Sequence, residues 1–542
     1  MENFFNNTKK LIFQRQKDIL SSAIILSAMI IISRLFGFVR YRTFATYFTK
    51  EELDIFFAAF RIPDFVFEIL ITGALSSAFI PIFIKYKRNE ETVEENISSI
   101  MNFIFIGMII IMSVAFIAAE PISRIIAPGF SPEDIKQVAM LSRILILSQL
   151  PFLIAGNLLS GVAQANKIFF ITAIAPVVYN VGIILGTIFF SHQYWLYGPA
   201  IGVTIGAFLF FLVQLPVMYI VHFSYKLRSF KRNILKEFIT LFIPRMLSVL
   251  TNQIDLTIDL ILATLRGPGS YTIFYFSQHL QLFPVSFVGM AFGQAALPYV
   301  SNLFKEEKFH AVRKLFVDSI LQLLYLSIPL SIFFIFARTP IVRIVFGGRK
   351  FDWIGTNLTA MTVSIFALSV PIHSIFYFIT RSFYACHDTK TPFIINFFSV
   401  AVNAVLSIIF IVFMELPVWS LALSFSISIV INVALLLRAF HKKIGGFDVF
   451  KLIKNSIKIY IAAFLASIGP YVMLKVFDPL VIDTARTINV FILMGIIFGA
   501  YCISYLFFSW LFTIEEIYIL GRLFSQINEF KRRIEEVYTE SG

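Results

Sequence analysis

The chain contains only two cysteines and seven histidines in 542 residues. Cys386 and Cys502 lie far apart, each in or beside an apolar segment, so they form neither a disulfide framework nor a metal-binding spacing. The sequence also lacks a Walker loop, a Ser–His–Asp arrangement and a cluster of metal ligands. We therefore expect a protein that is not an enzyme and that carries no cofactor.

Charged residues are also scarce. Only 14% of the residues are charged, whereas 58% are hydrophobic and the mean hydropathy is +0.83. A soluble protein of this length would not carry so much apolar sequence. The formal charge of +13 would suit a nucleic-acid partner, but Lys and Arg also collect in the cytoplasmic loops of membrane proteins. Composition thus indicates a membrane protein, and we expect no nucleic-acid partner.

Long apolar runs divide the chain into about fourteen predicted spans, because a helix needs about 20 mostly apolar residues to cross a bilayer. The predicted spans are 20–41, 55–84, 97–118, 138–162, 168–191, 196–222, 238–264, 271–301, 316–337, 356–385, 392–414, 417–438, 456–476 and 487–512. We therefore predict an all-α polytopic membrane protein. Several spans contain proline, as at Pro63, Pro284 and Pro371. Such breaks persist only where neighbouring helices or a wet cavity satisfy the backbone, so we expect a polar interior.

Basic residues collect in four segments that an even number of predicted spans separates. These are the N-terminal tail, residues 223–237, residues 439–455 and the C-terminal tail. The opposite loops, such as 192–195 and 415–416, are nearly free of Lys and Arg. The positive-inside rule then places both termini in the cytoplasm. The first apolar run is long and ends in arginine, so we expect no cleaved signal peptide.

The sequence also repeats itself. "TGALSSAFIPIF" (72–83) resembles "AFGQAALPYVSN" (291–302), and Pro151, Pro176 and Asn180 have counterparts near Pro371 and Asn403. An offset spanning six helices gives both halves the same topology, which is a parallel repeat with a pseudo-twofold axis along the membrane normal. Chance similarity between apolar helices is the alternative. The predicted parts are a tail (1–19), an N-lobe (20–222, spans one to six), an inter-lobe loop (223–237), a C-lobe (238–440, spans seven to twelve), a C-terminal helix pair (441–512) and a tail (513–542).

Charged residues interrupt the predicted spans. On insertion scales, each charged residue at the centre of a span raises the free energy of membrane insertion by about 2.5–3.5 kcal/mol. The first span carries Arg34 and Arg40, and the second carries Arg61 beside Asp54. A guanidinium fork suits phosphate oxygens, so these arginines predict an interlobe cavity for an anionic, phosphate-bearing substrate. Structural ion pairs and interfacial anchors are the alternatives. Arg42 is expected to reach the membrane surface instead.

Polar residues of the seventh and eighth predicted spans would line the same cavity. They include Asp259, Gln278, His279 and Gln281. An uncharged His279 hydrogen-bonded to either glutamine or to the broken backbone is the alternative to a role in substrate binding.

Several motifs together resemble the MurJ/MviN family of lipid II flippases, of the multidrug/oligosaccharidyl-lipid/polysaccharide exporter superfamily. They are "SRLFGFVR" (33–40), "DIFFAAFRIPDF" (54–65), "GALSSAFIPIF" (73–83), "GVAQANKIFF…APVVYN" (161–180), "NQIDLTIDLILATL" (252–265), "LPYVSNL" (297–303) and "RSFYACHDTKTP" (381–392). Each motif alone is weak, but their order and spacing over essentially the whole chain are specific.

The resemblance implies a function in cell-wall synthesis. It implies that undecaprenyl-pyrophosphate-linked peptidoglycan precursor, lipid II, moves from the inner to the outer leaflet of a bacterial cytoplasmic membrane. Two lobes would alternate in access, and the last two spans would form a groove for the lipid tail. The expected partners are the lipid-linked precursor, membrane lipids and cell-wall synthesis proteins.

The resemblance also assigns substrate-binding residues. The family's first-span Ser-Arg and the following Arg match Ser33, Arg34 and Arg40. Its second-span acid matches Asp54, and a basic residue before Ile-Pro matches Arg61.

A monovalent-cation site is implied as well, because the seventh-span acid of a sodium site in some members matches Asp259, with Asn403 as a further candidate ligand. This sequence departs from the family at other positions. A second eleventh-span acid would fall at Ser407, and the arginines that often follow the Ile-Pro motif are Phe67 and Glu68. Thr72 stands where the family has an acidic residue before Gly-Ala, and His279 stands where an arginine is expected in the eighth span. The predicted cavity thus has less fixed positive charge than is usual in the family.

Three other functions remain as alternatives. An exporter of another lipid-linked glycan or of a drug fits the missing arginines, although the thirteenth and fourteenth spans oppose it. A membrane glycosyl- or acyltransferase would need acidic or histidine motifs in large loops, and the loops here are short. A non-transporting scaffold for cell-wall synthases is the third, and the retained Arg34, Arg40 and Asp54 argue against it.

Overall fold

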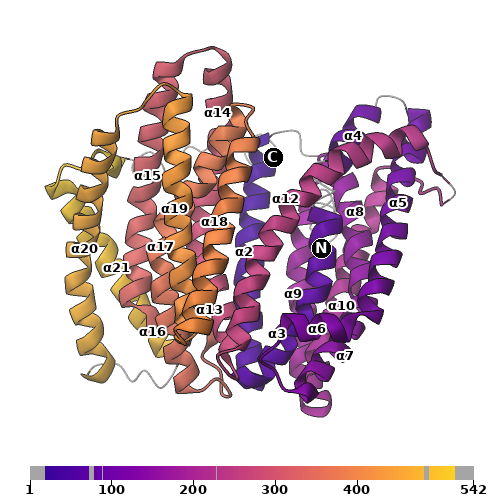
Figure 1. The fold of residues 1–542 in the computed structure, drawn as a ribbon, viewed down its shortest axis with the longest axis horizontal. Coiled ribbons are helices and arrows are strands. Elements are labelled where there is room, and N and C mark those ends of the chain that lie inside the picture. The colour runs from indigo at the N-terminus through magenta and orange to yellow at the C-terminus, as the bar shows by residue number, and fades with distance from the viewer. Residues whose placement is uncertain (1–18, 73–77, 88–89, 228, 481–486, 519–542) are drawn as a thin grey trace, which may run out of the picture. The chain divides into compact units, whose positions relative to one another are not determined.

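The computed structural model describes residues 19–72, 78–87, 90–227, 229–480 and 487–518, and these ranges are almost entirely helical with no β-strand among them (Figure 1). The chain is divided into two compact units. The first contains Met1–Ile273 and Val345–Gly355, and the second contains Phe274–Ile344 and Thr356–Gly542. The predicted all-α fold is confirmed.

The first unit holds the helices of the N-terminal half. They are α2 (Ile19–Tyr47), α3 (Lys50–Phe67), the π-helix η1 (Glu68–Thr72), α4 (Ile80–Tyr86), α5 (Glu90–Ile117), α6 (Ala119–Ile126), α7 (Pro132–Ser148), α8 (Leu150–Ala165), α9 (Phe170–Tyr194), α10 (Tyr197–Gln214), α11 (Pro216–Ile220) and α12 (Arg232–Thr264). α13 (Ser270–Val285) begins in this unit and continues into the second. α12 therefore belongs to the first unit by its contacts, while the predicted lobe boundaries remain a prediction.

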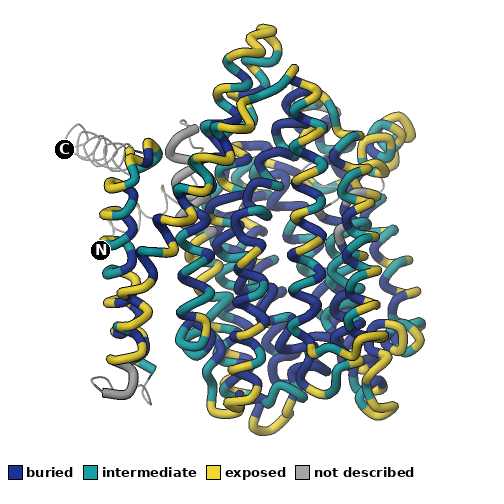
Figure 2. Tube along the Cα trace, turned by 60° about the vertical axis from the view of Figure 1, so that its left-hand side comes forward, coloured by how far each residue is buried: buried dark blue, intermediate teal, exposed yellow. Residues whose placement is uncertain are grey.

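The second unit holds most of the remaining elements. They are the π-helix η3 (Ser286–Met290), α14 (Ala291–Lys305), α15 (Phe309–Phe336), α16 (Arg338–Phe346), α17 (Trp353–Ala385), α18 (Lys390–Ile408), the π-helix η4 (Ile409–Phe413), α19 (Trp419–Lys443), α20 (Val449–Leu480), α21 (Thr487–Leu511) and the short 3₁₀-helix η5 (Glu515–Ile517). Buried residues follow the inner faces of the helices, and exposed residues mark loops and outward faces (Figure 2).

Apolar length confirms most of the predicted spans. Within the described residues, ten helices are long and apolar enough to cross a membrane, and the bent pair α7 and α8 makes eleven. The predicted spans 20–41 and 55–84 include residues outside the described ranges or side chains that are not described, and α12 is not among the ten. The protein is a multi-pass membrane protein, and the exact number of fourteen spans stays a prediction.

Glycine allows α9 and α10 to pack with their backbones in contact. A Cβ on Gly186 would lie 2.1 Å from the Cα of Gly202, and a Cβ on Gly182 would lie 2.4 Å from the Cα of Gly206. Small residues at this four-residue spacing let membrane helices approach closely, which increases their van der Waals contact. The interface therefore excludes any larger residue at these positions.

The local structure repeats in the two halves. Lys167 and His387 adopt positive φ angles of 61° and 56°, and Trp195 and Glu415 adopt 50° and 51°. The helix ends before the first pair make matching hydrogen bonds: the amides of Asn166 and Cys386 each donate to the carbonyl three residues earlier. The π-helices η1 and η3 likewise follow Pro63 and Pro284 in the repeated spans. These features fit the predicted offset.

The segment before α12 is anchored to the first half of α5. Asn102, which is buried, donates its side-chain amide to the backbone carbonyls of Lys226, Leu227 and Ser229 at 2.9–3.1 Å. A buried amide that bonds to three carbonyls holds a segment that lies outside any helix. Of the predicted inter-lobe loop 223–237, residues 223–227 and 229–231 form this segment, and residues 232–237 are the first turns of α12.

Candidate substrate-binding site

The predicted arginines of α2 differ in exposure. Arg34 is exposed and Ser33 is partly buried, whereas Arg40 is partly buried with its guanidinium 4.7 Å from the ring centroid of Tyr41. Six positions along an α-helix rotate a side chain by about 240°, so Arg34 and Arg40 point in different directions. The Tyr41 ring is itself buried against Phe57 of α3. Arg40 is therefore held in place by an aromatic partner, which the apolar sequence around it did not single out.

Arg61 of α3 binds α12 within the first unit. Its Nε donates to the Thr257 hydroxyl at 2.9 Å, and its Nη2 donates to both the backbone carbonyl and the side-chain oxygen of Gln253 at 2.8 Å. The sequence predicted that Arg61 would bind substrate phosphates. In this structure its donors instead join two helices that lie nearly 200 positions apart in sequence. The partners Gln253 and Thr257 lie one helical turn apart, a spacing that matches the width of a guanidinium fork.

Asp54 caps the beginning of α13. One carboxylate oxygen accepts the Gly269 amide at 2.6 Å, and the other accepts the Thr272 amide at 2.7 Å. The first amides of a helix have no partner within the helix, so a carboxylate from another helix can replace the usual capping side chain. The side chain is 3% exposed. The substrate-binding role predicted for Asp54 stays a prediction, and its oxygens are occupied by backbone here.

An ion pair beside this cap joins the start of α3 to the segment before α17. The Lys50 ammonium lies 2.8 Å from an Asp352 oxygen and 2.9 Å from a Glu51 oxygen, all within the first unit. Burial lowers the pKa of Lys50, but the two carboxylates outweigh it and raise the pKa above its ordinary value. Glu52 completes a capping box with Thr49 and accepts the indole N–H of Trp195 at 2.7 Å. Sequence reasoning missed these contacts, although "TKEE" is a recognisable capping-box pattern.

A cavity of about 580 Å³ opens beside these residues. Its lining includes Glu51, Glu52, Asp54, Asp134 and Trp195. The acids are engaged in the contacts above or, for Asp134, with the Ser131 hydroxyl at 2.7 Å. Its acidic lining does not suit a pyrophosphate.

His279 lies on α13 in the second unit. It is partly buried, its Nδ1 lies 2.9 Å from the carbonyl oxygen of Tyr275, and the two rings are 4.1 Å apart. Nearby, Gln281 donates to the Ser369 hydroxyl at 3.3 Å and faces the Nδ1 of His373 at 3.1 Å. The histidine ring therefore contacts a carbonyl of its own helix, and its role in substrate binding stays a prediction. The buried polar group around His373 was not predicted.

The candidate cation ligands belong to different units. Asp259 and Asn403 are both buried, Asp259 on α12 of the first unit and Asn403 on α18 of the second. Ser407, at the position of the expected second acid, forms a 2.6 Å hydrogen bond with Ser424. Within the described residues, no group of three His, Cys, Asp or Glu side chains is placed to hold a metal ion. The sodium site stays a prediction.

The fold defines the class of protein, an all-α multi-pass membrane protein, and it is shared with solved structures. A solved structure described as the inward-facing conformation of a multidrug resistance MATE family transporter of the MOP superfamily superposes with a TM-score of 0.66, at 14% identity, over 78% of this chain and 98% of the other. The family is narrower. Residues 44–491 match the model of the family "Lipid II flippase MurJ", and the chain belongs to this family, whose members are transporters rather than enzymes.

Individual relatives agree. A probable lipid II flippase MurJ of Buchnera aphidicola (subsp. Acyrthosiphon pisum) is 27% identical over 508 residues, covering 90% of this chain and 96% of its own. One of Borreliella burgdorferi is 29% identical over 456 residues, covering 81% and 87%. The solved structure "Lipid II flippase MurJ, inward closed conformation" has a TM-score of 0.75 at 25% identity and covers 90% of this chain and 99% of the other.

Proposed function

We propose that this protein moves lipid II from the inner to the outer leaflet of a bacterial cytoplasmic membrane for peptidoglycan synthesis. The family match over residues 44–491 supports this proposal most strongly. Alternating access of two lobes is the proposed mechanism, with both termini in the cytoplasm, as the basic loops favour. Cell-wall synthesis proteins are the proposed partners beside the lipid itself.

The substrate-binding proposal rests on Arg34 and Arg40. Guanidinium groups on an apolar helix suit pyrophosphate oxygens better than they suit a neutral glycan. Arg61 is proposed as a further contact, with its Nε and Nη2 held by Gln253 and Thr257. Ser33, Asp54 and His279 are proposed as further contacts from the family's pattern.

Complementation tests the function directly. The gene should restore growth to a strain depleted of its lipid II flippase. Arg34→Ala and Arg40→Ala should each abolish growth at normal protein levels, and Arg→Lys should restore it only partly, because an ammonium cannot form the bidentate contact. Arg42→Ala, two positions after Arg40, is the matched control and should complement. Full growth with both alanine variants would contradict the arginine assignment.

A monovalent cation is the proposed coupling ion, with Asp259 and Asn403 as its ligands. Flipping by purified protein in liposomes should respond to a sodium gradient and lose that response in Asp259→Asn. Transport that ignores sodium in both proteins would remove the ion from the mechanism while leaving the flippase function intact.

A further inference from the structure

A basic cavity of about 460 Å³ lies in the second unit, and its lining includes none of the residues of the candidate substrate-binding site. It opens between the first turns of α15 and the segment that joins α19 to α20. Its charged and titratable lining consists of His310, Arg313, Lys314, Asp318, Asp448 and Lys451. The cavity belongs to the loop region 439–455, which the basic residues place on the cytoplasmic side.

The two acids of the cavity already have partners. Asp318 lies 3.2 Å from the Lys451 ammonium, and Asp448 accepts the backbone amide of Lys451 at the start of α20. The beginning of α20 is therefore capped by the protein itself, so helix-end polarity is not the basis of the site. What remains available to a ligand is the positive charge of Arg313 and Lys314.

The guanidinium of Arg313 is held at the cavity by its backbone contact. Its Nε donates to the Ile444 carbonyl at 2.8 Å, and a Cβ on Gly445 would lie 2.6 Å from its Nη2. Gly445 has a φ of 75°, a conformation that glycine adopts without strain. Lys314 is exposed and has no ion-pair partner among the described side chains. One fixed fork beside one mobile ammonium is a suitable pair for phosphate oxygens.

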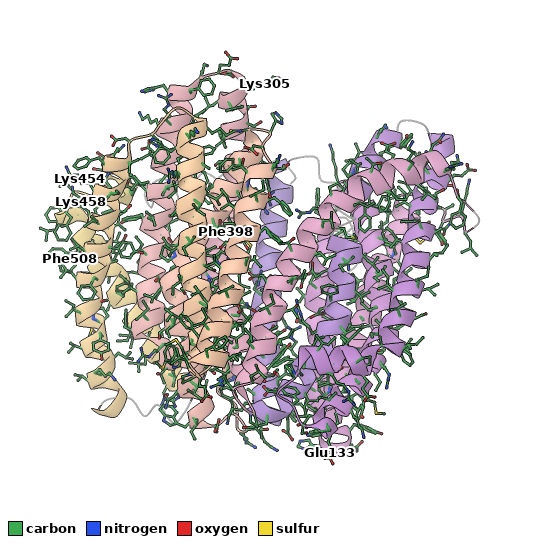
Figure 3. The ribbon with its side chains drawn as sticks, viewed as in Figure 1. Glu133, Lys305, Phe398, Lys454, Lys458 and Phe508 are labelled. Carbon is green, nitrogen blue, oxygen red and sulfur yellow. The ribbon has the colours of Figure 1, made fainter. Side chains whose placement is uncertain are left out.

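An apolar surface and further lysines continue from the cavity along α20. Phe450 and Ile453 are 76% and 53% exposed. Lys454 and Lys458, which are labelled in Figure 3, follow Lys451 at helical spacings that place all three on one side of the helix. A free phosphate would use only the charges, whereas a lipid phosphate would use the charges and the apolar surface together. Basic pockets between membrane helices on the cytoplasmic side are a recurrent setting for lipid head groups.

We propose that this cavity binds the phosphate group of a membrane lipid, with Arg313 and Lys314 as ligands and the hydrocarbon chain along the start of α20. Two lipids carry such a phosphate, an anionic phospholipid and the polyprenyl pyrophosphate that the proposed function transports, and the experiment distinguishes them. Only the second source rests on the proposed function.

Native mass spectrometry of the purified full-length protein measures the binding. The probes are phosphatidylglycerol, phosphatidylcholine, a polyprenyl pyrophosphate and inorganic phosphate. We expect Lys314→Gln to weaken binding of at least one anionic lipid about threefold and Lys314→Glu about tenfold, which corresponds to about 1.4 kcal/mol. Arg313→Lys should weaken it as well, and Lys314→Glu keeps the test valid if that variant unfolds. Lys305→Gln, an exposed lysine at the end of α14 outside the cavity, is the control (Figure 3).

The lipid whose binding is lost identifies the ligand of the cavity. Loss confined to phosphatidylglycerol assigns the cavity to a phospholipid, and loss confined to the polyprenyl lipid assigns it to the substrate. Equal binding by wild type and both Lys314 variants overturns the proposal, and so does inorganic phosphate that competes as well as either lipid. Because lipid binding is measured without transport, failure of the flippase assay leaves this test unaffected.

Discussion

Replacing Gly186 by alanine should destabilise the contact between α9 and α10. The added Cβ would lie 2.1 Å from the Cα and 2.5 Å from the backbone N of Gly202, where no side-chain rotation relieves the clash. Carbon atoms in contact lie about 3.5–4.0 Å apart, so the two helices must separate by more than about 1 Å. Overpacking of this kind costs about 1–3 kcal/mol, and a gap of 0.5–1 Å also forfeits about a quarter to a half of each dispersion contact nearby. We expect a loss at the upper end of that range.

The matched control is Gly499→Ala on α21. A Cβ on Gly499 meets nothing within 4 Å. In a helix interior, alanine is favoured over glycine by about 0.5–1 kcal/mol, so this variant should be as stable as the wild type or slightly more stable. The same gain applies in principle to Gly186, so the difference between the two variants isolates the steric term.

The assay is thermal unfolding in detergent, followed by the fraction of protein that still elutes as a folded species after heating. Unfolding of a large membrane protein is often irreversible, so the variants are compared at one heating rate. Gly186→Ala should lose folded protein at a temperature several degrees lower than Gly499→Ala. Gly182→Ala should behave like Gly186→Ala, and the double variant should lose less than the sum because the helices separate only once. Equal midpoints for the Gly186 and Gly499 variants would refute the reasoning.

Three further predictions concern polar side chains. Asp54→Asn leaves one side-chain oxygen to accept the amides of Gly269 and Thr272. It should lower the free energy of unfolding by about 1–2 kcal/mol, measured as a lower unfolding temperature; an unchanged temperature would argue against the cap. Burial raises the pKa of Asp388, but the Thr391 amide and the Lys443 ammonium outweigh it and lower the pKa below its ordinary value. The stabilisation is then complete above the unfolded pKa of about 3.9 and is lost as pH falls through the lower folded pKa. Asp388→Asn should therefore cost about 0.5–2 kcal/mol at pH 7 and progressively less as pH falls below about 3.9, and a difference independent of pH would contradict this. Affinity for the pyrophosphate lipid should fall more steeply with rising pH in the wild type than in His279→Arg, because histidine, unlike arginine, can lose its charge in the neutral pH range; parallel curves would make His279 structural.

The sequence predicted the helices well because apolar length and proline act locally. The span predicted at 168–191 is α9, from Phe170 to Tyr194, and the span predicted at 316–337 lies within α15 apart from its last residue. The breaks predicted near Pro63 and Pro284 are also present, as π-helical turns a few residues later, whereas α17 continues through Pro371 as one α-helix. Each of these features depends on a few neighbouring residues.

The partners of the polar residues could not be predicted in the same way. Asp54 binds the amides of Gly269 and Thr272, and Arg61 binds Gln253 and Thr257, all of them about 200 residues away in sequence. One sequence shows that a charge lies within an apolar segment, and the cost of burial shows that it needs a partner. Which partner it meets depends on how the helices pack. The contact of His279 with the Tyr275 carbonyl one turn earlier is local, but the sequence did not single out this carbonyl.

The π-helical turn η3 has a consequence for length variation in this chain. A π-turn accommodates one residue more than an α-helix would in the same rise. The side chains before and after the turn therefore keep the directions they would have without the extra residue. Deleting one residue within Ser286–Met290 should convert the turn to α-helix and leave Gly293 of α14 packed on Tyr377 of α17. The same deletion inside α14 would instead rotate the residues beyond it by about 100° relative to those before it. Single-residue gaps between relatives should therefore concentrate in such turns, where the chain can change length without changing which residues face the core.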